Sequence, residues 1–68
     1  MTQVELVLNH MKEHGAITPI EAFTDYGIMR LASRIHQITR MGIAVEKEYV
    51  SGKNRYGVTV HFTRYKLA

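Results

Sequence analysis

Apolar residues in the first part of the chain recur at the spacing of an amphipathic helix. Within residues 3–14 they stand at i, i+3, i+4 and i+7, and this stripe consists of Val4, Val7, Leu8 and Met11. Thr2, followed three residues later by Glu5, predicts a capping box at the start of this helix. Gly15 supplies the left-handed residue that commonly ends a helix.

A second, shorter helix is predicted to start at Thr18 and Pro19. A hydroxyl N-cap followed by proline at the first helical position is a helix-start signal, and Gly27 ends the segment. Ile20 and Phe23 are expected to pack inward, with Tyr26 near the end of the helix.

The third periodic stretch covers residues 28–41. Its predicted inward face is formed by Ile28, Leu31, Ala32, Ile35 and Ile38. Gly42 closes the helix, just after Arg40 in the favoured basic last turn. Two helices joined through a single glycine, Gly27, form a helix-turn-helix arrangement.

Beyond the third helix the pattern changes to β-branched and aromatic residues in partial alternation. Residues 43–50 and 58–62 predict two strands, and the polar loop 52–57 between them predicts a β-hairpin. Residues 64–67 continue the alternation in the opposite phase, so we expect a β-bulge near Thr63.

Length and composition indicate one folded domain over residues 1–68, of the α+β class, with three helices and a C-terminal hairpin. A hydrophobic content of 46% predicts a compact core rather than disorder. The absence of cysteine excludes disulfides and thiolate zinc sites. No apolar run approaches the roughly 20 residues of a membrane span, and the first residues lack a signal-peptide pattern. We therefore expect a cytoplasmic protein with no membrane partner.

Charge divides the chain into two unequal parts. Residues 1–26 carry one lysine against four acidic residues, whereas residues 27–68 carry eight lysines and arginines against two glutamates. A surface that binds a polyanion requires such a basic region, although an uneven, merely solvated surface gives the same count.

The outward face of the third helix carries the side chains with the clearest functional chemistry. The candidate DNA-contacting residues on or beside this face are Arg30, Ser33, Arg34, Gln37 and Arg40. Arginine and glutamine make the bidentate hydrogen bonds that distinguish guanine and adenine in the major groove. No acidic residue interrupts the face, whereas a purely solvated helix gains ion pairs from mixed signs.

The hairpin tip is the second candidate contact. Lys53, Asn54 and Arg55 lie there, and such a tip can contact phosphates or enter a minor groove. An ordinary soluble loop is the alternative, because asparagine and glycine are also generic turn residues.

Catalytic and metal-binding chemistry is not indicated. His10 and His14 have the i, i+4 spacing of a metal pair, but without a third ligand they are expected to be partly exposed histidines. No nucleophile, base and orienting group can be assembled, and no glycine-rich phosphate loop is present. We expect no enzyme activity, cofactor, metal or small-molecule substrate.

Three segments of the chain resemble a known family. They are residues 17–22 (ITPIEA), 27–35 (GIMRLASRI) and 52–57 (GKNRYG). Together they resemble the winged helix-turn-helix domains of very small phage and prophage DNA-binding proteins. The resemblance implies that residues 29–40 form the recognition helix and residues 52–57 the wing tip. The tight bacterial pattern places a small residue where Phe23 stands, so the turn is expected to be looser or differently angled.

The resulting hypothesis is sequence-specific binding of double-stranded DNA by a phage or prophage transcriptional regulator or accessory factor. A single module buries only about 600–1,000 Å² on DNA, so a homodimer or a larger protein partner is plausible. The alternative is a winged helix that binds and modulates a host protein through Met29, Tyr49 or Tyr56. RNA binding is less favoured, because the tyrosines are scattered rather than gathered on a sheet.

Overall fold

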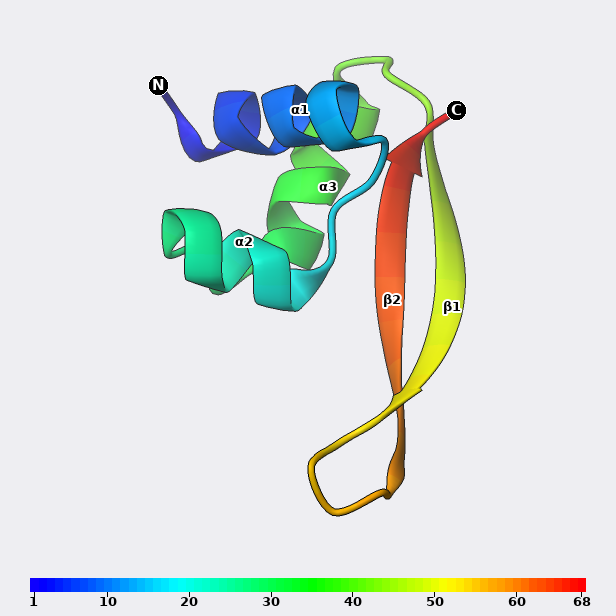
Figure 1. The fold of residues 1–68 in the computed structure, drawn as a ribbon. Coiled ribbons are helices and arrows are strands. Elements are labelled where there is room, and N and C mark those ends of the chain that lie inside the picture. Colours follow the sequence, from blue (N-terminus) through cyan, green and yellow to red (C-terminus); the bar gives the residue numbers. More distant parts are fainter.

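The computed structural model describes residues 1–68 as three helices followed by a two-stranded antiparallel ribbon (Figure 1). The elements are α1 (Gln3–His14), α2 (Pro19–Tyr26), α3 (Leu31–Arg40), β1 (Val45–Lys53) and β2 (Thr59–Leu67). The helices pack together at one end, and the ribbon extends beyond them (Figure 1). The α+β fold and the order of its elements are therefore as the sequence predicts. No helix is both long enough and apolar enough to cross a membrane.

Capping boxes start the first two helices. The Thr2 hydroxyl accepts from the Glu5 N–H at 3.1 Å, and the Glu5 carboxylate accepts from the Thr2 N–H at 3.0 Å. These hydrogen bonds from Thr2 lower the pKa of Glu5, because they stabilise its ionised carboxylate. Thr18 and Glu21 make the same reciprocal pair at the start of α2. The predicted capping box of α1 is confirmed.

The core lies between the three helices and the base of the ribbon. Its buried apolar residues are Val7, Met11, Ile17, Ala22, Ile28, Leu31, Ile35, Ile38 and Tyr65. Ile17, in the link between α1 and α2, forms an antiparallel bridge to Tyr65 with N–H to carbonyl distances of 2.8 and 2.9 Å. Full burial of a valine, leucine, isoleucine or methionine side chain stabilises the fold by about 1.5–3 kcal/mol. The core thus fixes α3 and the base of the ribbon.

The orientation of α2 differs from the sequence prediction. Ile20 and Phe23, expected to pack inward, are 70% and 55% exposed, whereas Ala22 is fully buried. Ala22 and Tyr26 stand four residues apart and form the side of α2 that packs on the core. Helical spacing fits either side of this eight-residue helix, because Ile20 with Phe23 and Ala22 with Tyr26 both make an apolar side. Tertiary packing places the side with the small residue, Ala22, against the core.

The start of α3 also differs from the prediction. The helix begins at Leu31, and Ile28 is buried ahead of it instead of inside it. Gly27 has a left-handed conformation (φ 68°) that ends α2. Residues 27–30 therefore form the connection between the two helices. Ala32, predicted to face inward, is exposed because it lies at the flank of the buried stripe of α3.

The predicted bulge in the ribbon is absent. The nine residue pairs of β1 and β2 follow one another without interruption, including the pair that contains Thr63. The change of phase instead reflects the two faces of the ribbon, because successive side chains point to opposite sides. Tyr65 and Leu67 pack on the core, whereas Val60 and Phe62 belong to the other face.

Candidate nucleic-acid interface

The outward face of α3 lies opposite its buried stripe. The stripe consists of Leu31, Ile35 and Ile38. At 100° per residue, the positions furthest from this stripe are Ser33, His36, Gln37 and Arg40. Gln37 and Arg40 are exposed, and Ser33 is half-buried. Three of the five sequence-predicted contact residues of this region therefore share one face of the helix.

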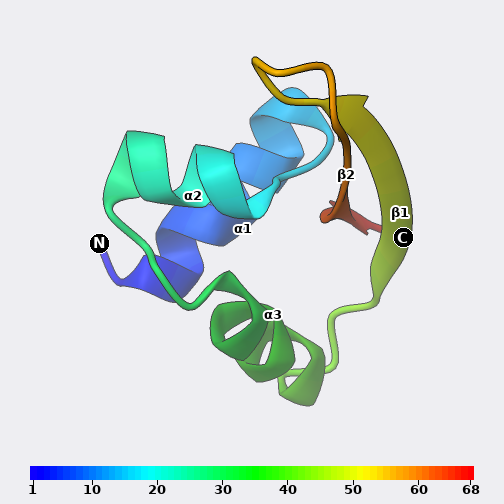
Figure 2. The same cartoon turned by 90° about the horizontal axis from the view of Figure 1, so that it is seen from below.

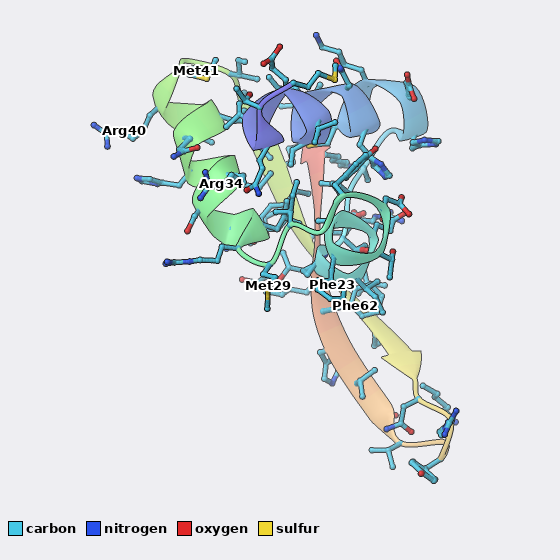
Figure 3. The ribbon with its side chains drawn as sticks, turned by 90° about the vertical axis from the view of Figure 1, so that its left-hand side faces the viewer. Phe23, Met29, Arg34, Arg40, Met41 and Phe62 are labelled. Atoms are coloured by element: carbon cyan, nitrogen blue, oxygen red, sulfur yellow. The ribbon has the colours of Figure 1, made fainter.

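Arg34 lies at the edge of this face. Its side chain is half-buried, and Nη1 donates a hydrogen bond to the Gln37 Oε1 at 3.4 Å. Nε is buried without a hydrogen-bond partner. Figure 3 shows Arg34 and Arg40 on the side of α3 that faces away from the ribbon. The contact between Arg34 and Gln37 orients the glutamine amide on the outward face.

Arg30 precedes the helix instead of lying on it. It is the exposed N-cap residue of α3, and its backbone carbonyl accepts from the N–H groups of Ser33 and Arg34. No side chain caps this end, so the first N–H groups of the helix are not occupied by a capping side chain. Arg30 thus stands at the positive end of the helix dipole, where an anion such as a phosphate is favoured.

His36 is an exposed residue of this face that the sequence prediction did not include among the contacts. It lies three residues after Ser33 and four before Arg40, so the three side chains are neighbours on the helix surface. The signal for His36 was the helical spacing itself. Arginine and glutamine are predicted as contacts from their hydrogen-bonding groups. Helical spacing alone places His36 on the same face.

The ribbon tip is shaped by Asn54. Its Oδ1 accepts from the N–H groups of Tyr56 and Val58 at 2.9 and 3.1 Å. The asparagine oxygen is thus occupied inside the loop, in the manner of an Asx turn. The flanking Lys53 and Arg55 are exposed. Of the three predicted tip residues, two present cations to solvent and the third holds their loop.

Four of the five charged residues on the rest of the ribbon form ion pairs, and the fifth, Lys47, lies over the Tyr65 ring at 5.9 Å from its centroid. Arg64 forms an ion pair with Glu48, and Lys66 approaches Glu46 at 3.6 Å and Glu48 at 3.9 Å. These residues stand opposite each other in the strand register, so the pairs are cross-strand neighbours. The only two acidic residues of residues 27–68, Glu46 and Glu48, are both in these ion pairs. No basic residue of α3 or of the tip forms an ion pair.

A family model described as a winged helix-turn-helix domain matches residues 2–68. The chain belongs to the winged helix-turn-helix family. Membership supports DNA binding in general. No curated protein and no solved structure matches the chain. Within the family's architecture, α3 occupies the place of the recognition helix and the ribbon that of the wing.

The recognition helix and the wing tip lie far apart. The molecule measures 39 × 22 × 20 Å along its principal axes. Seen from below, α3 lies on one side of the domain and the tip of the ribbon on the other (Figure 2). Figure 3 shows the same separation, with the tip extending away from Arg34 and Arg40. A ligand that contacts both basic regions must therefore be extended.

The histidine pair of α1 is divided between the interior and the surface. His10 is buried, contrary to the expectation of partial exposure, whereas His14 is exposed. A hydrogen bond of 2.8 Å joins His10 Nδ1 to the Tyr26 hydroxyl. His10 Nε2 has no hydrogen-bond partner and lies 3.7 Å from Glu21 Oε2. The structure places no three His, Cys, Asp or Glu side chains together in a way that could hold a metal ion.

Tyr26 links α2 to α1 through this contact. Its pKa is raised, first by burial of the hydroxyl and then by the negative charges of Asp25, Glu13 and Glu21. The neutral hydroxyl is therefore favoured in the folded state. These acidic residues lie on α1 and α2, whereas the basic outward face belongs to α3.

Proposed function

We propose that this winged helix-turn-helix domain binds double-stranded DNA with sequence preference. One observation carries the proposal: the outward face of α3 combines Gln37 and Arg40 with no acidic residue and no ion pair. Both glutamates of the basic half are paired on the ribbon, away from this face. Beyond α2, the cations without an ion pair are Arg30, Arg34 and Arg40 at or on α3, Lys53 and Arg55 at the wing tip, and Lys47 over the Tyr65 ring.

The recognition helix supplies the base contacts in this proposal. Gln37 and Arg40 reach base edges in the major groove, where amide and guanidinium groups make bidentate hydrogen bonds. Ser33 contributes a shorter hydroxyl contact on the same face, and Arg34 holds Gln37 from the side. Arg30, beside the open start of α3, contacts a phosphate.

The wing tip supplies backbone contacts at a distance from the helix. Lys53 and Arg55 reach the flanking phosphates or the minor groove, while Asn54 maintains the loop that presents them. A duplex satisfies the separation of the two regions, since it carries phosphates along its whole length.

We further propose that the chain acts in the cytoplasm as a transcriptional regulator, or as an accessory DNA-binding factor, of a phage or prophage. The resemblance of residues 17–22, 27–35 and 52–57 to small phage proteins supports this role. The proposed activity needs no cofactor, metal or small-molecule substrate, because hydrogen bonds and charge alone achieve recognition.

The test is selection of bound duplexes from a random DNA pool at roughly 150 mM salt, where non-specific electrostatic binding is suppressed. We expect an enriched motif. Binding without enrichment, lost as salt rises, would contradict sequence preference while retaining DNA as the partner. No binding at all would reject the DNA proposal and favour the protein-binding alternative.

A further inference from the structure

An uncharged, exposed surface lies between α2 and the ribbon. This apolar patch consists of Pro19, Ile20, Phe23, Val60 and Phe62. Pro19, Ile20, Val60 and Phe62 line a hollow of about 310 Å³. Phe23 follows Ile20 by about one helical turn and is exposed, so it extends the patch along α2. Contiguous exposed apolar surface of this kind marks an interaction site.

Four side chains of the patch are accessible to solvent. Ile20 and Phe23 are 70% and 55% exposed, and Val60 and Phe62 are 39% and 37% exposed. An aromatic side chain buries roughly 150–250 Å² when it is covered. Covering the patch on two copies with its immediate rim would remove on the order of 1,000 Å², the lower limit for a specific interface.

The electrostatics of the patch permit contact with an identical surface. No charged side chain lines the hollow. The next cross-strand pair on the ribbon face of Phe62 is Glu48 with Arg64, and these two side chains neutralise each other. Two copies of a charged surface would repel, whereas two copies of this one meet without like-charge repulsion.

The patch combines a recess with an exposed aromatic ring. Phe23 stands one helical turn after Ile20, which lines the hollow, and Phe23 is 55% exposed. A two-fold contact requires each copy to offer both a protruding group and a recess that receives it. Phe23 of one copy then fills the hollow of the other, and the reverse contact follows from the symmetry.

We propose that the apolar patch is a two-fold interface between two copies of this chain. Arg34 and Arg40 lie on a different side of the molecule (Figure 3), so both recognition helices stay open in the dimer. The biological role of the dimer rests on the proposed function, since a second recognition helix reads a second half-site. The contact itself does not depend on DNA.

Sedimentation equilibrium of the full chain without DNA tests the interface. We expect a dimer whose population rises with protein concentration. Phe23→Asp should weaken dimerisation by at least about 30-fold, because it places an unpaired carboxylate in the contact. Ile20→Lys, at a 70% exposed position, provides a second disruption, and circular dichroism checks that both variants fold. Tyr49→Asp is the matched control, because Tyr49 is 79% exposed and belongs to the opposite ribbon face.

A wild-type chain that stays monomeric at millimolar concentration would overturn the interface, as would a dimer unaffected by both patch variants. Selection on DNA separates this result from the proposed function. A palindromic motif for the wild type and a single half-site for Phe23→Asp supports the dimer. An enriched half-site with a monomeric wild type rejects the dimer and retains DNA binding. A dimer that selects no DNA motif retains the interface and counts against sequence-specific binding.

Discussion

The recognition helix α3 and the wing tip, the two basic regions of the domain, are held in place by different interactions. The recognition helix is fixed by side chains in the core, and the wing tip is fixed by its own turn. Ile38, in the last turn of α3, is fully buried, whereas no residue of the tip is buried. Hydrogen bonds to Asn54 close the tip, beyond the reach of the core cluster.

This difference assigns different tasks to the two regions. Reading base edges requires side chains held to within about 0.5 Å, which favours a helix whose position is set by packing. Phosphate contacts tolerate more freedom, because the charge attracts from several directions and carries no sequence information. The helix is therefore suited to specificity, and the tip to affinity.

The largest expected effect follows from removing the support of the recognition helix. Ile38→Ala should lower the free energy of unfolding by about 2–5 kcal/mol, because it leaves a cavity in the core. A domain of this length has a total of roughly 3–10 kcal/mol, so DNA binding should fall with the folded population. Denaturant titration measures the loss. Val58→Ala, at an exposed site near the tip, is the control and should change stability by about 0.5 kcal/mol or less.

Removing the arginines of α3 should affect recognition without affecting the fold. Arg34→Ala with Arg40→Ala should weaken binding to the selected site by about 30-fold or more, because Arg40 loses its base contact and Gln37 loses the side chain that orients it, and each base contact contributes about 1–3 kcal/mol. Fluorescence anisotropy with specific and scrambled duplexes measures the loss. The paired control, Arg34→Lys with Arg40→Lys, keeps the charge but not the bidentate geometry, so it should lose preference and retain non-specific binding. Loss of helical signal in the alanine variant would show that these arginines are structural.

Removing the cations of the wing tip should have a smaller and more uniform effect. Lys53→Ala with Arg55→Ala should weaken all duplexes alike and reduce the slope of log K against log salt by about two. Lys12→Ala removes a cation from α1, on the acidic side, and should leave the salt slope unchanged. A change in sequence preference on removing the tip cations would assign base reading to the wing.

The sequence predicts the local structure well because its signals are local. Thr2 with Glu5, and Thr18 with Pro19, start helices through contacts three residues apart, and Gly27 ends α2 by its left-handed backbone. The orientation of α2 is a tertiary property, however. Whether Ile20 or Ala22 faces the core depends on how closely α1 and α3 approach, which spacing alone does not state.

In the candidate site, some residues likewise follow from local sequence signals, whereas others depend on tertiary structure. The residues at positions 33, 37 and 40 follow from helical periodicity, and the structure places them on one face of α3. The role of Asn54 inside its loop and the ion pair of Arg64 with Glu48 depend on side-chain geometry and strand register. Burial of His10 depends on a partner sixteen residues away, Tyr26, and periodicity carries no signal for it.

The smallest expected effect concerns pH and the contact between α1 and α2. Burial and the nearby carboxylates of Asp25, Glu13 and Glu21 raise the pKa of Tyr26 in the folded state above its ordinary value near 10. The unfolded chain therefore releases this proton first as pH rises, so the stabilisation is complete below about pH 10 and is lost above it. Denaturant titrations from pH 8 to 11 should show stability falling less steeply in Tyr26→Phe than in the wild type, whatever constant offset the lost hydrogen bond to His10 adds. Tyr49→Phe removes an exposed tyrosine of the ribbon and should reproduce the wild-type slope. Equal slopes of unfolding free energy against pH in all three proteins would contradict this prediction. They would show that the α1–α2 contact stabilises the neutral and the ionised forms of Tyr26 equally.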